Sequence, residues 1–300
     1  MAATAHLPQA LDGRRAAIVA FPGSGYGRGY FDINVDGFPG YSQADYHTAN
    51  GLILIAVDHL CVGDSTVPSD MDKATKEVVV DADAEAARQL IEAVRQGTLA
   101  ADLPPIPDIV AIGMGQSLGG YLGAIVQARH APFDALAVLG FSAIHTVISQ
   151  PGGPVRVMSP AQLGAGIEQI TDWVWPFHWE DEPSELVHAD MGGGYPIRAR
   201  VPPWGSATGP LCAFNGLLPA EISQDVAAIA VPVFLGIAER DVILAPHEEP
   251  RAYRSAPSVW TEIIPRMAHM HNFAPTREML WRRIERFASA IAEERRATTA

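Results

Sequence analysis

Ser117 is the residue whose surroundings most clearly indicate chemistry. It lies between Gly115 and Gly119 in the pattern G-x-S-x-G, directly after the apolar run 109–112 and just before a segment typical of a helix. A serine at the apex of such a turn has a strained backbone, and neighbours without side chains let the turn close. Its hydroxyl then projects from the sheet, and the N–H of Leu118 can face a developing oxyanion. The alternative is a glycine-rich turn with an incidental serine, and the five-residue pattern leaves both open.

A serine that attacks a carbonyl needs two partners, because its hydroxyl is a poor nucleophile at neutral pH. A histidine must take the proton, and an acidic residue must orient that histidine. In open parallel sheets, functional groups gather at the carboxyl ends of the strands. Asp241 lies just after the apolar run 230–237, and His269 and His271 lie just after the run 259–264. The chain order Ser, Asp, His therefore predicts a nucleophile, an acid and a base at the ends of three strands.

Two of these assignments have a competitor nearby. Glu239 is the nearest alternative acid, but the position of Asp241 at a strand end favours Asp241, and His271 is an alternative to His269 as the base. The H-x-H spacing would suit a metal pair, yet the sequence positions no third ligand, and this chemistry needs no metal. The glycine-rich loop 23–29 lacks the G-K-[ST] of a phosphate-binding loop. We therefore predict no metal and no cofactor.

A sheet must position these residues, and six short apolar runs predict its strands. The runs are typical of strands covered on both faces: 15–21, 51–58, 109–112, 135–141, 230–237 and 259–264. Apolar residues at helical spacing predict surface helices over 70–97 and 276–294, and residues 1–13 are expected to be a loose lead-in. The order of these elements predicts an α/β fold, with a mostly parallel sheet flanked by helices.

The regular pattern lapses between about 146 and 228, where prolines and glycines are frequent and aromatic residues cluster. This stretch is too long for a loop and too irregular for another strand–helix unit. We interpret it as a cap or lid inserted into the core, which divides the chain into 1–145, 146–228 and 229–300. The residues expected to line the substrate site are Tyr26, Trp173, Trp175 and Trp179, whereas His178 and His188 are expected to be polar surface.

Five motifs give the chain a resemblance to α/β-hydrolase-fold enzymes with a cap. They run nearly end to end and leave only about 146–228 unmatched: F-P-G-S-G (21–25), V-D-H-L-C-V-G-D-S (57–65), G-Q-S-L-G (115–119), V-P-V-F-L-G-I-A-E-R-D (231–241) and A-H-M-H-N (268–272). The resemblance implies Ser117 as nucleophile, Asp241 as acid and His269 as base. His269 takes the place of the histidine in the family's usual G-H pair, although Ala268 stands where glycine is usual. The serine argues against the dehalogenase branch, which needs an aspartate at that position.

The resemblance also implies an oxyanion hole with two backbone donors. One is the N–H of Leu118, directly after the nucleophile. The other comes from the loop after the first strand, where the family often has H-G-x. Here Pro22-Gly23 replaces His-Gly, so Ser24 takes the donor position, with Gly23 and Gly25 as alternatives.

Composition and charge narrow the classes of partner. The 300 residues carry a net charge of −13, which disfavours binding to nucleic acid or to an anionic membrane. Cys61 and Cys212 are far apart and form no C-x-x-C pair, so no disulfide framework is expected. No apolar run approaches the ~20 residues that cross a bilayer, and the N-terminus lacks the features of a signal peptide. We expect a cytoplasmic protein whose partner is a small-molecule substrate.

The expected reaction is hydrolysis of an ester-type bond through an acyl-enzyme on Ser117. The aromatic residues of the inserted segment favour a small apolar or aromatic substrate, as a carboxylic ester, a thioester or a lactone. An acyltransferase would use the same three residues, and a C–C bond hydrolase is a further alternative. A non-catalytic ligand-binding protein is less expected, because the Ser, Asp and His set is intact.

Overall fold

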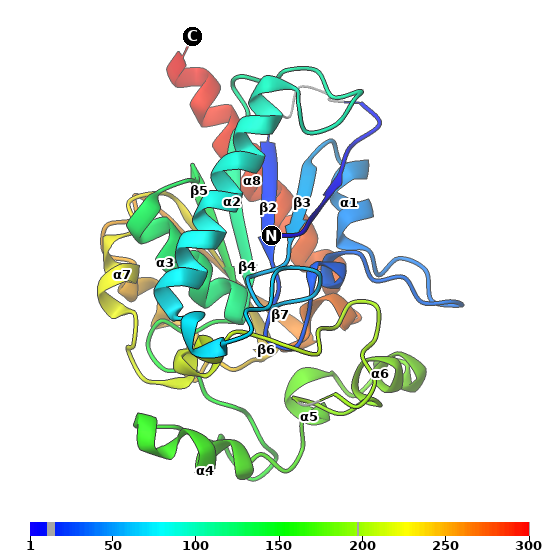
Figure 1. The fold of residues 1–300 in the computed structure, drawn as a ribbon, viewed down its shortest axis with the longest axis vertical. Helices are drawn as coiled ribbons and strands as arrows, with labels where there is room; N and C mark the ends of the chain where they lie inside the picture. The colour runs from blue at the N-terminus through cyan, green and yellow to red at the C-terminus, as the bar shows by residue number, and fades with distance from the viewer. Residues whose placement is uncertain (11–15, 197, 300) are drawn as a thin grey trace.

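A seven-stranded sheet forms the centre of the molecule (Figure 1). The computed structural model describes residues 1–10, 16–196 and 198–299. The strands lie in the order β1-β3-β2-β4-β5-β6-β7, and every pairing is parallel except that of β1 with β3. Their bounds are β1 (Ala3–His6), β2 (Ala16–Phe21), β3 (Ile53–Val57), β4 (Val110–Gln116), β5 (Ala135–Leu139), β6 (Val233–Arg240) and β7 (Val259–Ala268).

Helices cover both faces of the sheet and divide the core in two. Those on one face are α2 (Lys76–Gln96) and α3 (Leu118–His130), and those on the other are α1 (Gln43–Ala49) and α8 (Arg277–Thr299) (Figure 1). Successive residues of β2 alternate between the two cores: Val19 belongs to the core under α2 and α3, and Ile18 to the core under α8. Strands β2 to β6 therefore carry continuous apolar runs, because both of their faces are buried. This arrangement confirms the predicted α/β fold class.

The predicted strands are all present, although several of their ends differ: β6 spans Val233–Arg240 and β7 continues to Ala268. The prediction for the first strand began at Arg15, which lies outside the described residues. The strand at 109–112 continues to Gln116, because Gly113 stays in the sheet, where a Cβ would lie 2.4 Å from the Phe133 ring. Glycine in this strand therefore permits close packing rather than marking a turn.

The prediction that residues 1–13 form a loose lead-in is wrong for β1. Ala3 to His6 pair antiparallel with β3, from Ala3 opposite Val57 to His6 opposite Leu54. Three of the four β1 residues are exposed, so the strand lacks the apolar run that predicted the others. An edge strand is held mainly by backbone hydrogen bonds, and these leave no mark on residue type.

The chain leaves the sheet after β5 and returns at β6. Between them lie α4 (Leu163–Glu168), α5 (Val174–Phe177), α6 (Ser184–Met191) and α7 (Ser223–Ala228). Figure 1 shows α4, α5 and α6 below the sheet, whereas α7 lies beside α3, against which it packs. Short 3-10 helices complete the chain at Arg28–Phe31, Met71–Lys73, Pro160–Gln162, Leu211–Leu217, Glu249–Ala252 and His271–Phe273. Within the described ranges, no helix is both long and apolar enough to span a membrane.

Candidate active site

The turn between β4 and α3 holds Ser117 in a conformation that side chains rarely adopt. Its φ is 55° and its ψ is −113°, between the last strand residue and the first helix residue. A Cβ on Gly115 would lie 2.1 Å from the carbonyl oxygen of Gly119, and a Cβ on Gly119 would lie 2.1 Å from that of Phe21. Both glycines are therefore required for the backbone to close the turn.

The structure brings Ser117, His269 and Asp241 together. The Ser117 hydroxyl donates to Nε2 of His269 over 2.9 Å, and Nδ1 of His269 donates to Oδ1 of Asp241 over 2.7 Å. The three residues follow β4, β7 and β6, at the carboxyl ends of parallel strands in the same half of the sheet. Ser117 is partly exposed, whereas the other two side chains are buried. This geometry would suit a nucleophile, a general base and an orienting acid.

Asp241 is held as a carboxylate by four hydrogen-bond donors. Oδ1 accepts the N–H of Val242 besides His269, and Oδ2 accepts the N–H of Ala238 and Nε2 of His271. Burial alone would raise the pKa of this carboxyl, but the nearby His271 and the hydrogen bonds from both histidines lower it well below its usual range. The acid therefore stays ionised and fixes the tautomer of His269.

The two competing residues have other positions. His271 contacts Asp241 over 3.0 Å, and no bond joins it to Ser117. Glu239 is exposed, and its Oε2 accepts the N–H of Arg266. Ligand atoms of Asp241 and the two histidines lie within 4.8 Å of one another, a spacing that a metal ion could use. Hydrogen bonds between these residues already account for that spacing.

The loop that carries His269 is fixed from two sides. The side-chain amide of Gln116 donates to the carbonyl oxygen of His269 over 2.9 Å. The N–H groups of His269 and Met270 donate to the carbonyl oxygens of Pro176 and Phe177 in α5, over 3.1 and 2.9 Å. Sequence reasoning missed these contacts, since backbone acceptors carry no signal in residue type. The inserted segment therefore supports the histidine as well as covering it.

A cavity of about 70 Å³ lies beside Ser117 and His269. No Asp, Glu, Lys or Arg lines it, within the part of the chain that the structure describes. Its walls are largely aromatic and aliphatic: Leu118, Tyr121, Phe141, Ile148, Trp173, Phe177, Tyr195, Phe214, Leu217 and Val242. Of the predicted residues, Ser24, Leu118 and Trp173 lie in these walls. The lining suits an uncharged, largely apolar group.

The structure does not place Tyr26, Trp175 or Trp179 in this cavity. Tyr26 is buried, and its hydroxyl donates to Asp190 over 2.7 Å. Trp175 and Trp179 both contact the Arg240 guanidinium, whose centre is 4.2 and 4.7 Å from their ring centres. The aromatic cluster was recognisable in the sequence, but an irregular segment has no periodicity to indicate which rings face the site.

Phe177 and Tyr195 occupy the wall that those tryptophans were expected to form. The ring of Phe177 lies 5.1 Å from that of His269 and 4.9 Å from that of Tyr195. The hydroxyl of Tyr195 also donates to the carbonyl oxygen of Ser24 over 3.1 Å. Gly25, whose φ is +78°, passes so close to Tyr195 that a Cβ would lie 2.8 Å from the ring. The inserted segment and the loop after β2 are therefore joined at the site.

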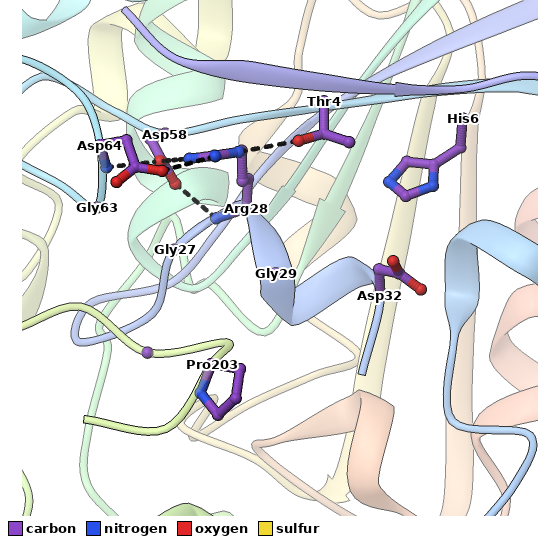
Figure 2. Close-up of a pocket in the computed structure, with 11 residues that line it drawn as sticks. Thr4, His6, Gly27, Arg28, Gly29, Asp32, Asp58, Gly63, Asp64 and Pro203 are labelled. Carbon is purple, nitrogen blue, oxygen red and sulfur yellow. Dashed lines mark hydrogen bonds and ion pairs between the residues drawn. The ribbon is translucent and has the colours of Figure 1, made fainter. Parts of the chain in front are cut away.

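A second, polar cavity of about 300 Å³ lies near the end of β3 (Figure 2). Figure 2 shows the guanidinium of Arg28 bound to three side chains at once: Thr4, Asp58 and Asp64. Asp58 also accepts the N–H groups of Arg28 and Asp64. Gly63 has φ +54°, and a Cβ there would lie 2.4 Å from Asp58. The motif at 57–65 thus builds a structural ion-pair cluster whose central cation is already engaged.

Known proteins resemble this chain in structure but not in sequence. No protein-family model and no curated protein matches it. A thermophilic esterase from Thermogutta terrifontis superposes with a TM-score of 0.64 at 14% identity, over 97% of this chain and 93% of the other. A soluble variant of monoglyceride lipase from Saccharomyces cerevisiae gives 0.62 at 14%, over 96% and 91%. A proline iminopeptidase from Mycobacterium smegmatis gives 0.54 at 15%, over 97% and 95%. With the sheet order and the strand-to-helix turn at Ser117, these likenesses establish that the chain has the α/β-hydrolase fold.

Proposed function

We propose that this protein is a serine hydrolase that cleaves an ester-type bond of a small, largely apolar or aromatic substrate. The observation that carries the proposal is the hydrogen-bonded series from Ser117 through His269 to Asp241, beside a cavity without charged residues. The bond is that of a carboxylic ester, a thioester or a lactone. The cytoplasmic location expected from the sequence stays a prediction.

In the proposed reaction, the Ser117 oxygen attacks the substrate carbonyl while Nε2 of His269 takes the hydroxyl proton. The tetrahedral oxyanion accepts hydrogen bonds from the N–H groups of Leu118 and Ser24. Where such donors have been removed one at a time, kcat falls about 10²–10³-fold. Collapse expels the alcohol, which receives the proton from His269. Water, deprotonated by the same ring, then releases the acyl group from Ser117.

Two observations support Ser24 as the second donor. Ser24 lines the cavity together with Ser117 and Leu118, and no described residue accepts its N–H. The carbonyl oxygen of Ser24 is held by Tyr195, so the backbone around the donor is fixed. The small size of the cavity favours a short acyl group.

Covalent labelling tests the nucleophile directly. We expect a fluorophosphonate probe to label the wild type and the matched control Ser184→Ala, an exposed serine of the inserted segment, and not to label Ser117→Ala. A panel of p-nitrophenyl esters of increasing acyl length would then report the preferred chain length. Equal labelling of the wild type and Ser117→Ala would show that the mechanism is wrong. Product analysis with and without an added alcohol separates hydrolysis from acyl transfer.

A further inference from the structure

A buried histidine lies directly behind the loop that follows β2. His59 comes just after β3, is fully buried, and stacks on the Phe21 ring at 5.4 Å between ring centres. Its Nδ1 lies 2.6 Å from Oδ2 of Asp83 in α2, and its Nε2 lies 3.1 Å from the carbonyl oxygen of Pro22. Pro22 is the first residue of the loop that leads to Ser24. The ring therefore connects α2, β3 and this loop.

Both ring nitrogens of His59 face acceptors, and this fixes the state of the ring. A neutral imidazole has one N–H and one lone pair, so it would turn the lone pair towards one of the two oxygens. Both contacts are attractive only when both nitrogens carry a proton. Burial opposes that charge, but Asp83 and the Pro22 carbonyl outweigh it and raise the pKa of His59. Oδ1 of Asp83, which does not contact His59, has no hydrogen-bond partner in the described part of the chain.

The contact at Pro22 controls a peptide unit at the edge of the site. The Pro22 C=O and the Gly23 N–H belong to one planar group, so fixing the oxygen also fixes the direction of the N–H. Gly23 lies against the nucleophile, since a Cβ there would be 3.2 Å from the Cβ of Ser117. The next peptide along the chain carries the N–H of Ser24, so its direction depends on how the Pro22–Gly23 peptide is held. His59 therefore acts on the orientation of the loop that presents the Ser24 N–H.

We propose that His59 is a positioning residue that holds the oxyanion loop, residues 22–25, through the carbonyl oxygen of Pro22. The inference rests on the proposed function, because it assigns that loop to oxyanion binding. Tyr195 holds the same loop at Ser24 from the inserted segment, and His59 holds it from the core. The imidazole that holds the loop therefore lies just after β3, and the loop itself has Pro22 where the family often has histidine.

Substrates that differ only in the atom facing the oxyanion hole give the sharpest test. A thionoester carries sulfur in place of the carbonyl oxygen, and sulfur accepts hydrogen bonds weakly. We would compare kcat and KM for a p-nitrophenyl ester and its thionoester with His59→Phe, which keeps the ring and removes both N–H groups. Asp83→Asn, which removes the countercharge and keeps the shape, gives a second variant. The matched control is His47→Phe, a buried histidine whose recorded side-chain bond is to Gln43.

We expect His59→Phe to lower kcat for the ester about 10–100-fold, with KM within about twofold. Turnover of the thionoester falls much less, so the ester-to-thionoester rate ratio drops about tenfold. Asp83→Asn changes the ratio in the same direction, and His47→Phe leaves it unchanged. Thermal unfolding of each variant checks that it is folded, and Asp83→Asn carries the test if His59→Phe does not fold.

Two outcomes overturn the inference alone. In one, ester and thionoester turnover fall by the same factor, as general loosening of the structure would cause. In the other, the folded variants turn over the ester like the wild type. A wild type that cleaves no ester and labels equally with and without Ser117 overturns the proposed function, and the inference with it.

Discussion

Two buried clusters in this molecule combine carboxylates and imidazoles in opposite ways. In the site, the Asp241 carboxylate lies between the rings of His269 and His271. In the inserted segment, the ring of His178 lies between two carboxylates. Both clusters are buried, so each hydrogen bond acts in a medium of low polarity. The site has one carboxylate between two rings, whereas the other cluster has one ring between two carboxylates. We infer that this difference decides whether the histidine exchanges its proton or keeps it.

The cluster in the inserted segment keeps its proton. His178 donates from Nδ1 to Glu182 over 2.6 Å and from Nε2 to Asp190 over 2.9 Å. Burial alone would lower the pKa of His178, but the hydrogen bonds to Asp190 and Glu182 raise it to about 9. Asp190 also accepts the Tyr26 hydroxyl and the Trp204 indole N–H, over 2.7 and 2.8 Å. The charged ring thus holds Asp190 in place, and Asp190 links this segment to the loop after β2 through Tyr26.

The cluster in the site leaves one ring nitrogen for exchange. Asp241 has more donors than it needs to stay ionised, so His269 donates from Nδ1 and presents Nε2 to Ser117. In the described part of the chain, no second carboxylate contacts His269. The ring is therefore oriented by a carboxylate on one side and bonds Ser117 on the other, an arrangement that would suit a general base. The comparison gives four predictions.

The largest effect is expected at the carboxylate of the site. Asp241→Asn removes the charge that fixes the tautomer of His269, and we expect kcat for a short-chain ester to fall about 10⁴-fold. Glu239→Gln, the neighbouring carboxyl in the sequence, is the matched control and should keep wild-type turnover. Steady-state kinetics of both variants measure the difference. Equal losses in the two variants would contradict the assignment of the acid.

A change at the ring of the other cluster should act on stability. His178→Phe leaves the buried Glu182 without its cation, whereas Asp190 keeps the Arg198 guanidinium 3.6 Å away. We expect the free energy of unfolding to fall by about 3–5 kcal/mol. His188→Phe, at an exposed histidine of α6, should change it by no more than about 0.5 kcal/mol. Urea denaturation followed by tryptophan fluorescence measures both. A similar loss in the two variants would contradict a stabilising role for the cluster.

The loss of stability caused by His178→Phe should also depend on pH. The pKa of His178 is raised from 6.5 to about 9, so its contribution to stability is fully present below about pH 6.5 and is lost as the pH rises through 9. The gap in stability between wild type and His178→Phe should therefore narrow on going from pH 6 to pH 9. A gap that widens with pH would contradict a charged His178.

The smallest effect is expected at the second histidine of the site. His271→Phe removes one of the four donors to Asp241 and leaves the bond from Nδ1 of His269 in place. We expect kcat for a short-chain ester to fall by no more than about tenfold. The exposed His247→Phe serves as the control. A loss as large as that of Asp241→Asn would contradict the secondary position of His271.

Sequence analysis predicted the parts of the molecule in which the residue types themselves indicate the structure. Continuous apolar runs predicted strands β2 to β7, and chemistry at strand ends predicted Ser117, Asp241 and His269, which the structure brings together. The parts it missed depend on partners from elsewhere in the chain. His178 was expected at the surface, because its two carboxylates gave no visible sign of burial. His59 carried no signal, since its partners are a backbone oxygen and a helix residue.

The hydrogen bonds from α5 to the His269 loop limit how freely the protein can be redesigned. The carbonyl oxygens of Pro176 and Phe177 hold the loop that bears His269. If the inserted segment were exchanged for another to alter selectivity, these two hydrogen bonds would be lost together with the cavity wall. A graft that preserves the backbone path at 174–178 and replaces only the chain on either side would keep the base in place. The two ends of the inserted segment could therefore be exchanged, whereas its middle is needed to hold the His269 loop.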